Sequence, residues 1–321
     1  MRSLLRPLLL LLAAALLAAL LAVGCGSVGC QFGGVDDSAL MLLRTQRASL
    51  AFAVGALLAL AGALLQLLLR NPLADPYVLG VSGGAAVGAV ASGLLLPLAL
   101  QPVSLQAGAL AGALLAIMLL FMLARRSLLA SPQPAAVPGV RLILTGVMVS
   151  TGFGALLALL LSLAPDTQLR GTMFWLMGDL DADGFGLPAW AVLFAVGSWA
   201  IRRAPHFNVL AHGDATAQLL GLPVARLRTA ILFFASVATA AAVAQAGAIG
   251  FVGLVVPHAL RLWLGNDQRL LLPAAMLGGG AALLLADLLA RALLAPVQLP
   301  VGVVTALLGV PLFLAMLARS R

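Results

Sequence analysis

The stretch PHFNVLAHGDATAQLLGLPVARLR, residues 205–228, is the longest water-compatible interruption in the C-terminal half of an otherwise apolar chain. We expect Asp214 to cap a short helix over residues 215–220. Gly221 is expected to end this helix in the left-handed conformation, and Pro223 to open the next helix at its first position. A helix of about two turns has little stability alone in water. The sequence therefore predicts a short helical platform that is held by a partner protein rather than by lipid.

The composition is that of an integral membrane protein. Hydrophobic residues make up 63% of the 321 residues, charged residues make up 9%, and the mean hydropathy is +1.14. A hydrocarbon core of about 30 Å takes roughly 20 apolar residues per helix, so the chain divides into about ten crossings. We predict an all-α membrane protein in which residues 1–321 form a single transmembrane domain. The net charge of +8 comes from arginines that orient the chain in the bilayer, and it does not indicate nucleic-acid binding.

The apolar runs place the crossings along the chain. We expect them at residues 4–24, 47–69, from 80 onward, up to 125–126, and at 141–163, 186–201, 229–246, 247–265, 270–293 and 300–318. The segment 169–184 is too short to cross, and its Trp175 and flanking aspartates suit an interfacial helix. The segment 247–265 contains Gly247, Gly250, Gly253 and Pro257, so we expect a broken helix that borders the conduction path.

The first apolar run has three interpretations: a signal peptide, a lipoprotein leader ending in AVGC at residues 22–25, or a retained helix. Its length exceeds the usual signal-peptide core, and more membrane helices follow, which favours the retained helix. Cys25 and Cys30 then lie just outside the membrane. They form either a small disulfide or two free thiols.

Glycines are spaced for close helix packing. Gly80, Gly84 and Gly88 form a stripe at a spacing of four, and Gly108 and Gly112 repeat it in the next helix. The first stripe includes the G-x-S-x-G pattern around Ser82, which raises the alternative of an intramembrane hydrolase. That pattern needs a preceding strand and a catalytic triad, and neither is evident between two membrane helices, so we expect no catalytic residue.

The arginines are distributed unevenly. With the N-terminus inside and ten crossings, fourteen of the eighteen lie on one side. Cytoplasmic loops carry this excess of positive charge. The sequence therefore predicts cytoplasmic N- and C-termini, and it places the platform at residues 205–228 in the cytoplasm.

Five segments, in order, resemble the permease subunits of the bacterial ABC importers for iron-siderophores, haem and vitamin B12, the type II importers. They are RNPLADPYVLGVSGGAAVGA (70–89), LRGTMFWLMGDL (169–180), LAHGDATAQLLGLPVARLR (210–228), GAIGFVGLVVPHALRLWLG (247–265) and LPVGVVTALLGVPLF (299–313). The resemblance implies a ten-helix subunit of the bacterial inner membrane. It further implies a homodimer, or a pair with a close relative, two ATP-binding subunits on the inside and a periplasmic substrate-binding protein outside.

The resemblance also assigns roles to residues. The loop at 205–228 corresponds to the family's coupling helix, which fits the ATPase, and the residues concerned are Gly213, Asp214, Ala215, Ala217, Gln218, Gly221, Arg226 and Arg228. Binding-protein docking is assigned to Arg44, Arg47 and Arg291, and the translocation path and gate to Gln66, Asn71 and Leu73. The alternatives for the docking arginines are that their side chains extend to the outer lipid headgroups, or that they pair within the chain, as Arg291 could with Asp287. For Gln66 the alternative is an interhelical hydrogen bond.

No cofactor is expected on this subunit. A chain without lysine has no phosphate-binding P-loop, so ATP and magnesium belong to the partner ATPase. His206, His212 and His258 are not spaced as a metal site. The expected substrate is a metal chelate, with a ferric siderophore favoured over haem and vitamin B12. An ion-coupled secondary transporter is the second functional class, but such proteins carry ionisable residues deep in their helices, and Asp287 is the one candidate.

Overall fold

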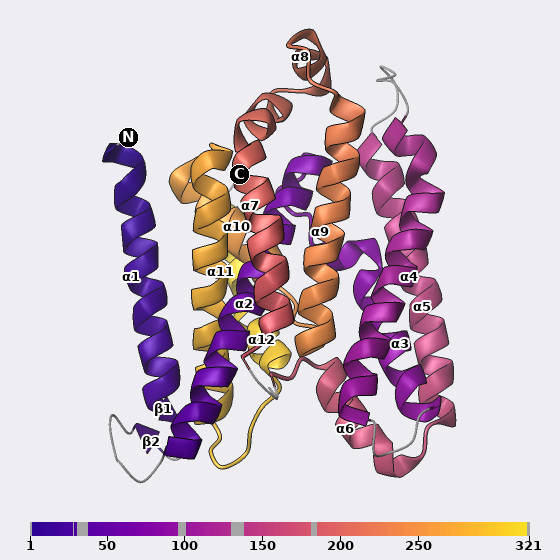
Figure 1. Ribbon diagram of the computed structural model, residues 1–321, viewed down its shortest axis with the longest axis vertical. Helices are drawn as coiled ribbons and strands as arrows, with labels where there is room; N and C mark the ends of the chain where they lie inside the picture. Colours follow the sequence, from indigo (N-terminus) through magenta and orange to yellow (C-terminus); the bar gives the residue numbers. More distant parts are fainter. Residues whose placement is uncertain are drawn as a thin grey trace.

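The central element of the computed structural model is α2 (Ser38–Leu69), a 32-residue helix (Figure 1). The structure describes residues 2–27, 29–30, 38–95, 101–129, 138–180 and 185–319. Of the most apolar part of α2, 89% is buried inside the protein. A helix that is apolar all round is expected in such a position, and this one is encased by its neighbours rather than by lipid.

The other helices form a bundle around α2. They are α1 (Arg2–Gly24), α3 (Val81–Leu95), α4 (Gln101–Leu129), α5 (Pro138–Leu163), α6 (Asp166–Leu176), α7 (Leu187–Ala211), α8 (Asp214–Leu219), α9 (Val224–Ala246), α10 (Val252–Leu264), α11 (Gln268–Ala292) and α12 (Val301–Arg319). Seven of the described helices have the length and hydropathy to cross a membrane, and α3 and α10 are shorter apolar helices. With α7 these account for the ten expected crossings, and α6 and α8 are the two short helices at the ends of the bundle.

The two ends of the bundle differ (Figure 1). The α8 side carries α8 and the first turn of α1. The α6 side carries α6 and the two short strands β1 (Cys25–Gly26) and β2 (Gly29–Cys30). These strands pair antiparallel, and a disulfide joins Cys25 to Cys30. Of the two alternatives for the cysteines, the structure has the disulfide. Asp181 and Asp183, counted with the interfacial segment, lie outside the described residues.

Helices α3 and α4 pack through glycine, as the spacing predicts. A Cβ atom at Gly88 would collide with the carbonyl oxygen of Gly108, and one at Gly84 would lie 2.5 Å from that of Gly112. Backbones approach this closely only where no side chain intervenes. Gly84 and Gly88 therefore form one helix–helix interface with Gly108 and Gly112, whereas Gly80 precedes α3 and faces Val149 of α5.

Two predicted boundaries are wrong. Helix α2 begins at Ser38, nine residues before the expected start at residue 47. Helix α7 continues through Pro205 to Ala211, so residues 205–211 belong to this helix and not to the platform. Phe207 is fully buried, and its ring centroid lies 5.5 Å from that of Trp199. The contact of Phe207 with Trp199, two turns earlier in α7, stabilises the helical conformation of residues 205–211.

Candidate functional site

The α8 loop projects from the bundle between α7 and α9 (Figure 1). Gly213 and Gly221 bracket it with φ angles of +118° and +79°, a region that glycine enters without strain. Ala217, in the middle of α8, is fully buried. Leu219 and Leu220 are 88% and 65% exposed. The platform therefore presents an apolar tip, which sequence reasoning overlooked although two adjacent leucines in a polar loop were a signal of it.

The predicted capping role of Asp214 is wrong. Asp214 is the first residue of α8, Gly213 takes the cap position, and no side-chain cap bond forms. Its carboxylate instead pairs with Arg70 through Oδ1 at 2.5 Å and with Arg228 through Oδ2 at 3.2 Å. Two guanidinium groups attract the carboxylate more strongly than a neutral backbone N–H does. The ion pairs tie α8 to the end of α2 and to the first turns of α9.

The other residues assigned to coupling are mostly at the surface. Ala215, Gln218 and Arg226 are exposed, whereas Arg228 is 9% exposed because of its contact with Asp214. Pro223 precedes α9 as its cap residue, one position before the predicted one. The surface available to a partner thus consists of α8 itself and Arg226.

The segment after α2 is a series of tight turns. Arg70 has a φ of +49°, and the backbone N–H of Asn71 donates to the carbonyl of Gln66 at 3.2 Å, which closes the helix end. The side-chain oxygen of Asn71 then accepts from the backbone N–H of Leu73 at 3.0 Å. Asp75 repeats this turn by accepting from the N–H of Tyr77 at 2.7 Å. Side chains therefore fix the backbone of this loop.

Tyr77 is the residue that sequence reasoning missed. It lies in the 3-10 helix η1 (Pro76–Leu79), and its hydroxyl donates to the carbonyl of Ile249 at 3.0 Å and accepts from the N–H of Ile249 at 2.8 Å. Burial raises the pKa of this hydroxyl, so it stays protonated. The available signal was that Tyr77 is the chain's one tyrosine, since a buried tyrosine needs a polar partner.

Ile249 belongs to the predicted break between α9 and α10. Residues 247–251 are not helical, and Gly247 and Phe251 have positive φ angles of +65° and +68°. The expected broken helix is therefore confirmed, while its place on a conduction path stays a prediction. The N–H of Asp179 donates to the carbonyl of Ala246 at 3.0 Å. Segments that lie far apart in sequence thus converge at this break.

The residues predicted for the path and gate lie at the end of α2 (Gln66) and in the turn that follows it (Asn71 and Leu73). Gln66 is 2% exposed, and its Nε2 donates to the carbonyls of Leu254 at 3.1 Å and Ala74 at 3.5 Å. The interhelical hydrogen bond considered for Gln66 is thus present. Leu73 is 38% exposed. A gating role for these residues stays a prediction.

The three docking arginines form a buried cluster around Asp287. The Nε atoms of Arg47 and Arg291 lie 2.8 and 2.9 Å from its two carboxylate oxygens, and Asp287 is fully buried. Arg44 donates to the carbonyl of Gly24 at 3.2 Å. The pairing of Arg291 with Asp287, considered as an alternative to docking, is thus present, and docking itself stays a prediction. Because arginines hold both oxygens of Asp287, this acid is poorly placed to carry a coupling ion.

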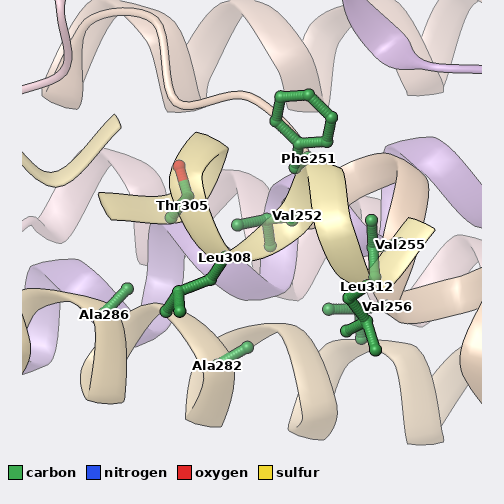
Figure 2. A pocket seen from close by; sticks show the side chains of 10 residues that line it. Phe251, Val252, Val255, Val256, Ala282, Ala286, Thr305, Leu308 and Leu312 are labelled. Carbon is green, nitrogen blue, oxygen red and sulfur yellow. The ribbon is translucent and has the colours of Figure 1, made fainter. Parts of the chain in front are cut away.

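Two cavities open near these groups. One, of about 140 Å³, lies between α10, α11 and α12, and its lining is aliphatic except for Phe251 and Thr305 (Figure 2). The other, of about 260 Å³, lies on the α8 side beside Gln66 and Arg70. No group of three His, Cys, Asp or Glu side chains placed to hold a metal ion occurs in the described part of the chain. Within those same residues no hydrogen bond joins Ser82 to a histidine or an acid.

Comparison with known proteins gives consistent matches. The FecCD transport family matches residues 7–319. The cobalamin import system permease protein BtuC of Halobacterium salinarum is 43% identical over 293 residues, which cover 90% of this chain and 76% of that protein. The hemin transport system permease protein HmuU of Yersinia pestis is 38% identical over 294 residues, covering 87% and 83%. A solved structure described as a metal-chelate type ABC transporter in an inward-facing conformation has a TM-score of 0.85 at 29% identity, covering 97% of this chain and 98% of that one.

Proposed function

The chain belongs to the FecCD transport family, and from this premise we propose that it is the permease subunit of an inner-membrane importer that carries a metal chelate from the periplasm into the cytoplasm. The energy comes from two ATP-binding subunits on the α8 side, and a periplasmic protein delivers the substrate on the α6 side. Two copies of this chain form the pathway between them. The subunit itself binds no nucleotide and carries out no covalent step.

The ion pairs of Asp214 carry the proposal. A movement of α8 must displace Asp214, and Asp214 is bonded to Arg70 at the end of α2 and to Arg228 in α9. Helix α2 is encased by its neighbours, and packed interiors transmit displacement rather than absorb it. Closure of the ATPase against the exposed leucines of α8 would therefore reach the centre of the bundle.

The orientation follows from chemistry at the two ends. A disulfide such as Cys25–Cys30 forms on an oxidising side, which supports a periplasmic α6 side. The arginine excess of the loops at the other end supports a cytoplasmic α8 side. We place both chain ends in the cytoplasm for the same reason.

The cargo is assigned by class. The relatives described above are named for cobalamin and hemin, both large metal chelates, so we put cobalamin first among the substrates to test. A ferric siderophore, favoured from sequence alone, and haem are the other two. A path with few fixed charges suits a bulky chelate of any of these kinds.

Transport by the reconstituted complex tests the proposal. The permease, its ATP-binding subunits and its binding protein are placed in liposomes, and uptake of each labelled chelate is measured with ATP, without ATP and with a proton or sodium gradient. We expect ATP-dependent uptake of one chelate. Uptake that needs no ATP and follows the ion gradient would instead assign the chain to the secondary transporters.

Cross-linking tests the coupling surface separately. Cysteine placed at Ala215 or Gln218 should cross-link to an engineered cysteine on the ATPase, and cysteine at Arg170 on the opposite side should not. Arg170 is exposed on α6 and serves as the matched control. If the residues on α8 never reach the ATPase while the complex remains active, the coupling assignment is wrong.

A further inference from the structure

Tyr77 connects two segments that are both attached to the α8 loop. Asp214, in α8, pairs with Arg70 at the end of α2 and with Arg228 in the first turns of α9. Tyr77 lies in η1, which follows Arg70 after a short loop, and Ile249 follows the C-terminal end of α9. The bonds between Tyr77 and Ile249 therefore join the far ends of the two segments whose near ends Asp214 holds.

The loop between Arg70 and Tyr77 is held in one shape by short-range hydrogen bonds. The backbone N–H of Ala74 donates to the carbonyl of Asn71 at 3.1 Å, in addition to the two side-chain turns at Asn71 and Asp75 described above. Asx turns of this kind restrict the backbone that they enclose. A displacement of Arg70 should therefore reach Tyr77 instead of being absorbed within the loop.

The break at residues 247–251 is a place where the backbone can turn. The carbonyl of Ala246, just before the break, accepts from the N–H of Asp179 at 3.0 Å. Phe251, at the other end of the break, has a φ of +68°, which is unfavourable for a residue that is not glycine. Hinges are commonly a few residues at the end of an element that can take up such a change in φ and ψ. The break is therefore suited to be a hinge between α9 and α10.

Tyr77 holds the middle of this break. Ile249 is fully buried, and one hydroxyl both donates to its carbonyl and accepts from its N–H. A buried peptide group that loses its partners is costly. The ring of η1 thus keeps Ile249 in place while the residues on either side of it remain able to turn.

We propose that Tyr77 is a positioning residue for transport, which holds Ile249 so that a displacement of α8 turns α10 at the break. The inference rests on the proposed function and deepens it by naming the joint at which the movement is converted. Phe251 also lines the cavity between α10, α11 and α12 (Figure 2). A turn at the break would therefore change the shape of that cavity.

The test compares uptake with ATP hydrolysis in the same liposomes. Tyr77→Phe removes the hydroxyl and keeps the ring, in the permease reconstituted with its ATP-binding subunits and binding protein. We expect the uptake per ATP hydrolysed to fall at least about fivefold, with ATP hydrolysis itself kept within about twofold. A purely structural loss lowers both rates together and leaves their ratio unchanged. The ratio therefore separates positioning from folding.

Two further variants give the controls. Thr239→Val removes a buried hydroxyl whose bond, to the carbonyl of Ala235 at 2.8 Å, lies within α9, and it should leave the ratio unchanged. Tyr77→p-aminophenylalanine keeps a group that can donate and accept at the same place, and it should restore the ratio.

Hydrogen exchange in the unsubstituted complex decides the matter if Tyr77→Phe does not assemble. The N–H of Ile249 should exchange slowly with and without ATP, because Tyr77 holds it in both states. Exchange at Ile249 as fast as in the exposed α8 loop would overturn the proposal.

Three transport results would also overturn it: an unchanged ratio in Tyr77→Phe, an equal fall of the ratio in Thr239→Val, or a fall of uptake and hydrolysis by the same factor. Failure of the proposed function looks different, because the unsubstituted complex would then show no ATP-driven uptake at all.

Discussion

Asp214 and Arg70 form an ion pair across 144 residues of sequence, with 2.5 Å between Oδ1 and Nη2. The pair joins the projecting α8 loop to the end of the central helix α2. Arg70 is 48% exposed at its side chain and Asp214 is 15% exposed. Solvent screens such a pair, so it contributes little to the free energy of unfolding. Its main effect is to link α8 to the end of α2.

The first prediction follows from this pair. Asp214→Asn should lower ATP-driven uptake at least about fivefold, the effect of losing a coupling free energy of about 1 kcal/mol. The unfolding free energy should fall by less than about 2 kcal/mol, because each of the two pairs is partly exposed. Uptake in liposomes and thermal unfolding in detergent measure the two effects.

Asp267→Asn is the control for Asp214→Asn, since it removes an acid from the same side of the bundle without touching α8. Its uptake should stay close to that of the unsubstituted chain. Equal losses of uptake in the two variants would mean that net charge, and not the Asp214 contact, matters.

The buried arginine cluster gives a prediction about stability. Asp287→Asn removes the carboxylate that pairs with both Arg47 and Arg291, which leaves these cations without that counter-charge. We expect a loss of about 3–5 kcal/mol in the free energy of unfolding. Denaturant unfolding of the detergent-solubilised chain measures it. The double variant Arg47→Gln with Asp287→Asn should lose less than the sum of the single variants, and strict additivity would contradict the coupling.

The α3–α4 interface gives a steric prediction. Gly88→Ala places a methyl group against the carbonyl oxygen of Gly108, so the helices must separate, at a cost of about 1–3 kcal/mol. Gly93→Ala, in the same helix, meets no atom within 4 Å and should be neutral or slightly stabilising. Thermal unfolding of the two variants side by side provides the comparison. A Gly88→Ala chain as stable as Gly93→Ala would show that the helices do not meet there.

The start of α11 gives a prediction about pH. Asn208 donates from Nδ2 to the Asp267 carboxylate at 2.7 Å, and this bond, aided by the N–H of Arg269 at 3.0 Å, lowers the pKa of Asp267 below its ordinary value of 3.8. A lowered pKa in the folded state contributes stability above the unfolded pKa, and this contribution disappears as the pH falls through the folded value.

We therefore expect the unfolding temperature of the unsubstituted chain relative to Asp267→Asn to be constant above about pH 4 and to decline below it. Thermal unfolding of both proteins is measured at several pH values between about 2.5 and 7, a range that includes the titration of a carboxyl group. The difference between the two unfolding temperatures is then plotted against pH. Loss of the difference near neutral pH would show that another group is responsible.

Much of the fold could be predicted from local pattern. Apolar run length located the crossings, and glycine spacing located the α3–α4 interface. Gly247 and Gly250 indicated the break before α10, whereas Pro257 lies inside the continuous helix α10. Each of these signals acts within one helix or between neighbouring segments, which is the range over which sequence periodicity carries information.

The site was less predictable because it depends on long-range partners. Asp214 looked like a helix cap because capping is a local rule, but Arg70 and Arg228 competed for the carboxylate. Tyr77 gave no local indication that it would bond the backbone of Ile249, 172 residues away. The helical continuation of α7 likewise depended on Phe207 meeting Trp199, a contact that the charged residues between them concealed.

The burial of α2 also constrains how the chain is made. During synthesis α2 leaves the ribosome long before α9 and α11, which cover it in the finished protein. Until then the apolar surface of α2 can face the lipid acyl chains at little cost, because acyl chains are as apolar as leucine. Arg47, however, pairs with Asp287, which lies 240 residues further along the chain and is synthesised much later. Until α11 has been synthesised, we expect the side chain of Arg47 to lie at the lipid headgroups. The helices can therefore complete their packing around α2 only late in synthesis.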